Sequence, residues 1–233
     1  LFRQPTRLRW LPVRALHGGF DSAALRQIAA VKCFQAFKRH EVRACDGGAG
    51  VSAQADGISV RVPGFSADLP RPPLMPGAHQ YGHLAAAIAA LAPWLALDTA
   101  KLAAACASAQ NPARLTLIDG KPRWLYDVAH NADSAEILAR YLHDLPRRGG
   151  RTIALCSILR DKDQHAIYRH LAPEIDEWVL AGLPGARGSD SATLTAHAVE
   201  AGIPREHIHP CDDIPAACQR ARALATPADT IAV

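Results

Sequence analysis

The chain has 233 residues and a formal net charge of +4, and 49% of its residues are hydrophobic. This length suffices for one large domain or two smaller ones, each with an adequate core. No apolar run approaches the roughly 20 residues that span a bilayer, so we expect no membrane partner. The arginines are scattered and are not interleaved with aromatic residues. This favours a solvated basic surface over a groove for nucleic acid.

The six cysteines contain no Cys-x-x-Cys pair, and Cys106 and Cys156 fall in apolar helix and strand patterns. These features predict a reduced, cytoplasmic protein with neither a disulfide framework nor a zinc site. Residues 1–5 contain neither an initiator methionine nor the apolar core of a signal peptide. We therefore expect the chain to be a piece of a longer product.

The first half of the chain predicts few elements. In order, they are a helix over residues 22–40, a strand over 57–63, a helix over 84–97 and a helix over 99–109. The strand is predicted because Ile58, Val60 and Val62 alternate with polar residues, as in a half-buried strand. The prolines of residues 70–76 exclude a helix there and indicate a connector.

The second half predicts a regular alternation of strands and helices. Strands are expected over 113–117, 124–128, 152–156, 178–181, 207–209 and 230–233, and helices over 132–143, 164–171, 191–201 and 214–224. Asp119-Gly120 indicates a tight hairpin turn between the first two strands. The later connections are too long for hairpins, so they predict a mainly parallel sheet with helices on both faces. The fold class is therefore α/β, a Rossmann-like doubly wound domain. Since no helix follows the last strand, we expect the chain to be cut at that end too.

One stretch of this half, residues 124–131, combines three large apolar residues with an acid, a histidine and an amide. Asp127 is expected at the carboxyl end of a buried strand, and Asn131 is placed to cap the following helix. In open α/β sheets, ligands bind outside the carboxyl ends of strands, and helix N-termini attract phosphate. Asp127, His130 and Asn131 therefore predict part of a nucleotide site.

Four separated motifs resemble one family. They are Gly77-x-His79-Gln80-x-x-His83, Pro112-x-Arg114-Leu115, Asp127-Val-Ala-His130-Asn131 and Leu159-Arg-Asp161-Lys162-Asp163. In this order they resemble the carboxy-terminal half of folylpolyglutamate synthase/dihydrofolate synthase, a branch of the Mur ligase superfamily. The resemblance runs from about residue 60 to the end of the printed sequence.

The resemblance implies an ATP-dependent ligase of folate biosynthesis and one-carbon metabolism. Such enzymes add L-glutamate to dihydropteroate or to a (tetrahydro)folate through an acyl phosphate, with ATP and Mg²⁺. The implied partners are these small molecules, and the implied protein is a cytoplasmic monomer that binds no nucleic acid.

The resemblance also implies which residues bind ATP. Arg114 matches an arginine that reaches the phosphates, Asp127 an acid near the ribose hydroxyls, and His130 a histidine of the same site. His83 takes the place of an asparagine that is expected to contact adenine. The alternatives from the residues themselves are a surface charge for Arg114, a turn-forming carboxylate for Asp127 and a capping imidazole for His130.

A second set of residues follows the next two strands. Asp161, Lys162 and Asp163 come after the strand 152–156, and the resemblance implies contacts with the amino-acid substrate. They could equally fix the loop, and Asp163 could cap the next helix. Arg187 also follows a strand and resembles a family arginine; the alternative is a solvated loop charge.

The sequence departs from the family in ways that bear on function. Ala113 stands where the family has glycine, and no Gly-x-x-Gly-Lys-Ser/Thr occurs anywhere. We therefore expect residues 1–110 to be part of a central ATPase-type domain without its P-loop and its Mg²⁺ ligands. Residues 111–233 would be the C-terminal Rossmann-like domain, truncated at its end. The isolated chain should then be inactive; the alternatives are a non-catalytic nucleotide-binding remnant and a Mur-type ligase acting on a cell-wall precursor.

Overall fold

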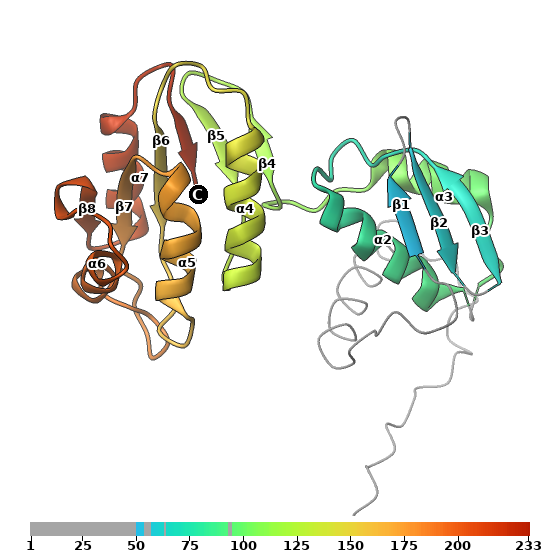
Figure 1. The fold of residues 1–233 in the computed structure, drawn as a ribbon, viewed down its shortest axis with the longest axis horizontal. Helices are drawn as coiled ribbons and strands as arrows, with labels where there is room; N and C mark the ends of the chain where they lie inside the picture. The colour runs from blue at the N-terminus through green and yellow to red at the C-terminus, as the bar shows by residue number, and fades with distance from the viewer. Residues whose placement is uncertain (1–49, 54–56, 63, 93–94) are drawn as a thin grey trace, which may run out of the picture. The chain divides into compact units, whose positions relative to one another are not determined.

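The computed structural model describes residues 50–53, 57–62, 64–92 and 95–233, so the helix predicted over 22–40 lies outside the described residues. Two compact units are present (Figure 1). The first contains the described residues up to Leu69 together with Tyr81–Thr99, and the second contains Pro70–Gln80 together with Ala100–Val233. The predicted division into domains at residue 110 stays a prediction.

The first unit contains a three-stranded antiparallel sheet. Its strands are β1 (Gly50–Ala53), β2 (Ile58–Val62) and β3 (Phe65–Leu69), with β2 in the middle. Strand β2 confirms the alternation in the sequence, because Ile58, Val60 and Val62 are buried. Strands β1 and β3 were not predicted. Gly64 allows the short β2–β3 connection, since its φ of +78° is one that side-chain-bearing residues rarely adopt.

Helix α2 (Ala78–Leu91) differs from the predicted helix over 84–97 at both ends. It begins six residues earlier, directly after Gly77, whose φ is +98° and whose carbonyl accepts from the amide of Gln80 at 3.0 Å. It ends before Pro93 in the sequence, a residue that cannot continue an α-helical ladder. Helix α3 (Thr99–Ser108) lies where a helix was predicted.

The second unit is organised around a six-stranded sheet of order β4-β5-β9-β6-β7-β8. The strands are β4 (Thr116–Ile118), β5 (Arg123–Tyr126), β6 (Thr152–Cys156), β7 (Glu177–Ala181), β8 (Ile208–Cys211) and β9 (Thr230–Ala232). Only the β4–β5 pair is antiparallel; the other four pairs are parallel. The predicted α/β class and mainly parallel sheet are confirmed. The position of β9 between β5 and β6 was not predicted.

Helices cover both faces of this sheet, as Figure 1 shows. They are α4 (Ala132–Asp144), α5 (Gln164–Leu171), α6 (Ser191–Glu200) and α7 (Ile214–Leu224), with the short 3-10 segments η2 (Ala172–Glu174) and η3 (Arg205–His207). Buried residues of α4, α5 and α6 share one core, and those of α7 belong to a second core on the opposite face. Along β7 the side chains alternate between the cores: Trp178 and Leu180 join the first, Val179 and Ala181 the second.

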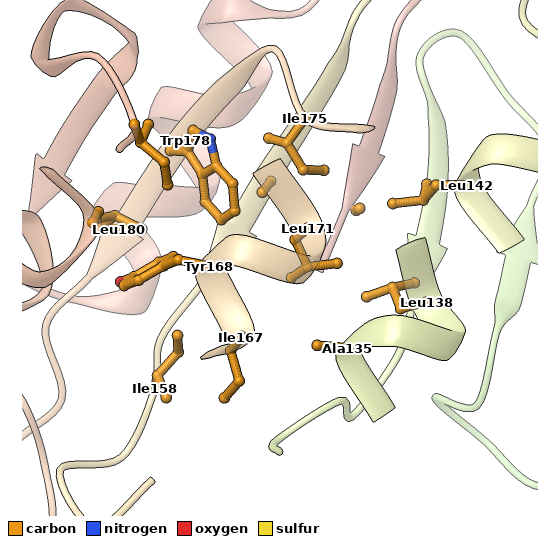
Figure 2. Packing of buried hydrophobic residues seen from close by; sticks show 14 of the residues in the cluster. Ala135, Leu138, Leu142, Ile158, Ile167, Tyr168, Leu171, Ile175, Trp178 and Leu180 are labelled. Atoms are coloured by element: carbon orange, nitrogen blue, oxygen red, sulfur yellow. The ribbon is translucent and has the colours of Figure 1, made fainter. Parts of the chain in front are cut away.

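The larger core holds its two biggest side chains in direct contact (Figure 2). The rings of Tyr168 on α5 and Trp178 on β7 meet edge to face, with centroids 5.4 Å apart and planes at 76°. The Tyr168 hydroxyl donates to the carbonyl of Leu194 on α6 at 3.3 Å. Tyr168 thus joins α5 both to the sheet and to α6.

The predicted start of a strand at Ala113 is wrong. Strand β4 begins only at Thr116, because Ala113 and Leu115 have φ values of +56° and +50°. These values lie in the left-handed region, which is incompatible with a strand. Arg114 therefore lies in a turn and not in the sheet.

Candidate functional site

The carboxyl ends of the parallel strands form one edge of the sheet, and most predicted site residues follow these ends. The loop after β5 carries Asp127 and His130, and the loop after β6 carries Asp161, Lys162 and Asp163. Arg187 lies in the loop after β7. His83, by contrast, is an exposed residue of α2 in the first unit. Six of the eight predicted residues therefore lie in loops at this edge, and Arg114 lies beside it, because its neighbour Leu115 contacts Asp127.

Arg114 is held in a turn that is anchored to the end of β5. One Asp127 carboxylate oxygen accepts from the amide of Leu115 at 2.8 Å, and the amide of Val128 donates to the carbonyl of Ala113 at 3.0 Å. The Leu115 side chain is buried in the larger core. The turn is thus fixed on both sides of Arg114, which presets the backbone that carries its guanidinium.

Asp127 has a partly desolvated carboxylate. Burial raises its pKa above the ordinary aspartate value, while the Leu115 amide and the Arg114 guanidinium oppose this rise. Burial thus disfavours the charged carboxylate, and the nearby donor and cation favour it. Asp127 therefore serves the predicted alternative of a turn-forming carboxylate, and its contact with a ribose stays a prediction.

His130 and Asn131 lie where α4 begins. The Asn131 side chain accepts from the Ser134 amide at 2.8 Å, and the Ser134 hydroxyl accepts from the backbone amides of Asn131 and His130. This reciprocal capping confirms the predicted cap. The His130 ring takes no part in it: its Nδ1 lies 2.9 Å from the Val128 carbonyl, which can only accept, so Nδ1 carries the proton.

The loops after β6 and β7 are joined by an ion pair. Two guanidinium nitrogens of Arg187 donate to the two carboxylate oxygens of Asp161, at 2.7 and 3.3 Å, and the Arg160 amide donates to the Arg187 carbonyl at 3.0 Å. The hydrogen bond from Arg187 holds the pKa of Asp161 below its usual value. Asp161 and Arg187 thus contact each other across the two loops.

Lys162 and Asp163 differ in their roles. The Lys162 amide closes the loop by donating to the Leu159 carbonyl at 3.1 Å. The Asp163 side chain accepts from the Ala166 amide at 2.9 Å and caps α5. The capping alternative for Asp163 is thereby observed.

The four helices that begin at this edge are all capped by their own preceding side chains. The caps are Asn131, Asp163, Asp190 and Asp213. Since a cap occupies helix N–H donors, these helix starts offer less to an anionic ligand than open helix N-termini do. An anion at this edge would therefore depend more on side-chain cations than on helix starts.

Within the described part of the chain, no group of three or more His, Cys, Asp or Glu side chains could hold a metal ion. Among the same residues, no helix is both long and apolar enough to cross a bilayer.

Comparison with known proteins identifies the family. The family described as "Mur ligase, glutamate ligase domain" matches residues 113–233. The chain belongs to the Mur ligase family. Its match begins at the turn that carries Arg114 and includes the whole six-stranded sheet.

Two curated relatives of this Mur ligase chain are named dihydrofolate synthase/folylpolyglutamate synthase. The one from Escherichia coli is 37% identical over 91 residues, which cover 39% of this chain and 21% of the relative. The one from Haemophilus influenzae is 38% identical over 78 residues, covering 33% of this chain and 18% of the relative. The matched segments thus span about a fifth of each relative.

Solved structures give the same relationship over more of the chain. FolC of Escherichia coli in complex with ADP has a TM-score of 0.68 and 29% identity, covering 81% of this chain and 43% of that one. A bifunctional folylpolyglutamate synthase/dihydrofolate synthase with Mn, AMPPNP and L-glutamate bound has a TM-score of 0.65 and 25% identity, covering 81% and 43%. This Mur ligase chain therefore spans less than half the length of these structures.

Proposed function

We propose that this chain is part of an ATP-dependent ligase that adds L-glutamate to dihydropteroate or to a folate through an acyl phosphate. The observation that carries the proposal is the Arg114 turn, fixed to the end of β5 by Asp127. The two curated relatives carry names that state this activity. Because the chain spans less than half of the related structures, the reaction is proposed for the whole protein.

The chemistry explains why a fixed arginine is useful. A carboxylate resists attack by an amine until it is phosphorylated, so catalysis consists mainly of positioning and charge neutralisation. A guanidinium stays charged and donates two parallel hydrogen bonds to phosphate oxygens. We propose that Arg114 binds the ATP phosphates, Asp127 and His130 the nucleoside side of the same site, and His83 the adenine.

The loops after β6 and β7 are proposed to serve the amino acid. L-Glutamate brings two carboxylates and an ammonium group, and these loops present Lys162 and Arg187 beside Asp161. The Asp163 carboxylate already accepts from the start of α5. We therefore assign Asp163 to fixing the loop, and the other three to the substrate side.

For magnesium, the described residues contain no group of three or more His, Cys, Asp or Glu side chains that could hold the ion. Its ligands, like the P-loop, are proposed to belong to the central domain, of which residues 1–110 would be a part. We propose that residues 111–233 form the C-terminal domain and that the isolated chain is a cytoplasmic monomer without ligase activity. ATP- and folate-dependent ligation of glutamate by the purified chain would overturn that statement.

Calorimetric titration with ATP tests the site. We expect measurable binding that Arg114→Ala weakens at least about tenfold, because a charge-assisted phosphate contact is lost. Arg140→Ala is the matched control, since Arg140 is an exposed arginine of α4 that pairs with Glu136. Asp127→Ala should also weaken binding, because it releases the turn. Equal affinities for the Arg114 and Arg140 variants would refute the assignment.

A second function, a nucleotide-binding remnant that catalyses nothing, is favoured by one observation. Ala113 has a φ of +56° at a position where the family has glycine, which is a strained substitution beside Arg114. An assay of the complete protein for glutamate ligation decides between the two, because the remnant would bind ATP without forming product.

A further inference from the structure

Gln164, the first residue of α5, is a buried amide at the carboxyl edge of the sheet. Only 4% of its surface is exposed, in contrast to the exposed Asp161 and Asp163 nearby. A buried amide with both ends hydrogen-bonded has a single orientation, since each wrong pairing would leave a polar group unsatisfied. Its partners therefore identify what it holds in place.

The partners of Gln164 come from three segments. Its nitrogen lies 3.2 and 3.3 Å from the carbonyls of Ile158 and Leu159, in the loop after β6, and 3.0 Å from the hydroxyl of Ser189, in the loop after β7. Its oxygen lies 2.7 Å from Nδ1 of His197 on α6. Carbonyls only accept, so the amide nitrogen must face them, and His197 must donate from Nδ1.

The two loops joined by this amide are those that carry the charged residues. Arg187 and Asp161 pair between the loops, and Lys162 follows Asp161. Both members of the ion pair are exposed, and an exposed pair contributes little to holding two segments together. The Gln164 contacts are buried: Ser189 is fully buried, and its carbonyl also accepts from the Leu183 amide, which closes the β7 loop.

We propose that Gln164 is a positioning residue of the amino-acid site, which sets the loop after β6 against the loop after β7 and so fixes Asp161, Lys162 and Arg187 relative to one another. This inference rests on the proposed function for the identity of the ligand. The arrangement of the loops can be tested without any ligand.

Gln164→Met removes both hydrogen-bonding groups and keeps most of the side-chain volume. We expect hydrogen exchange at the amides of Arg160 and Leu183 to become at least about tenfold faster, because the buried contacts between the loops are lost. The pKa of Asp161, followed by NMR, should rise towards that of an unpaired aspartate. Leu171→Val is the control: it trims a buried core residue of the same helix, and should leave both measurements unchanged.

Ser189→Ala is a second variant, which decides the matter if Gln164→Met does not fold. It removes one acceptor from the β7 loop and should shift the same two measurements in the same direction. Wild-type exchange in both loops together with a wild-type pKa for Asp161 would overturn the proposal.

Titration of the same variants with L-glutamate separates this inference from the proposed function. If the wild-type chain binds L-glutamate, Gln164→Met should weaken the affinity more than Leu171→Val does; equal losses would overturn the positioning role. If the wild-type chain does not bind L-glutamate, the assignment of the ligand fails. The exchange rates and the Asp161 pKa still decide whether Gln164 holds the loops.

Discussion

Replacing Ala113 with glycine should stabilise the second unit. A residue with a Cβ in the left-handed region carries a strain of roughly 1–2 kcal/mol, and Ala113 has a φ of +56°. Glycine removes this strain but gives the unfolded chain more freedom, which costs about 0.4–1 kcal/mol. The difference is a gain of about 0.5–1 kcal/mol in the free energy of unfolding. Such a gain would raise the melting temperature by about 1–4 °C.

Urea unfolding followed by the NMR signal of the Trp178 indole measures this gain, because Trp178 is buried in the core of the second unit. Ala186→Gly is the matched control: Ala186 is exposed in the loop after β7, and its φ is not positive. At position 186 the same substitution should lower the free energy of unfolding, since glycine relieves no strain there and only gives the unfolded chain more freedom. If Ala113→Gly lowers the urea midpoint as much as Ala186→Gly does, the turn is not strained and the reasoning fails.

Two further predictions concern charge and capping. Glu177 accepts from Arg151 at 3.2 Å and from His209 at 2.9 Å. Desolvation raises the pKa of Glu177, but His209 and His207 outweigh it and lower the pKa below its usual value. A lowered pKa contributes stability that is complete above the unfolded value of about 4.3 and is lost as the pH falls through the folded value. Glu177→Gln should therefore lower the free energy of unfolding by about 1–2 kcal/mol at pH 7. The urea midpoint of the variant should also fall less between pH 7 and pH 3 than that of the wild type. A fall equal to that of the wild type would contradict this prediction. Asn131→Ala should cost about 1 kcal/mol, because the α4 cap is lost, and an unchanged urea midpoint would show that the cap does not contribute.

The parts of the fold that could be predicted are those that depend on local patterns. Strand β6 and helices α5 and α7 lie within a residue of their predicted bounds, because apolar runs and helix-spaced residues are bounded there by caps or breaks. The cap at Asn131 was also predictable from its place before an apolar helix face. The order of the strands could not be predicted, since the position of β9 depends on contacts between residues far apart in the sequence.

The candidate site shows the same division. Asp127 and Arg187 could be located because charged residues after buried strands indicate the ligand edge. The turn at Ala113 and Leu115 could not be predicted, because neither residue type favours a positive φ. The pattern of residues 113–117 also resembles that of a strand. Gln164 was missed for a related reason: a glutamine at a helix start usually faces water, and only the folded loops show that it is buried.

The position of β9 has a consequence for how the second unit is assembled during synthesis. Among the residues that the structure describes, β5 pairs only with β4 and β9, and β6 only with β7 and β9. The sheet is therefore two separate pieces until residues 230–232 have been synthesised. Arg123 and Thr230, whose side chains bond in the finished sheet, are 107 positions apart. In a nascent chain, two sheet edges therefore stay unpaired and open to other chains until residues 230–232 have left the ribosome. Deleting these three residues should leave β5 and β6 unpaired with each other, joined only through the shared core of α4 and α5, whereas loss of an edge strand would leave the remaining strands paired.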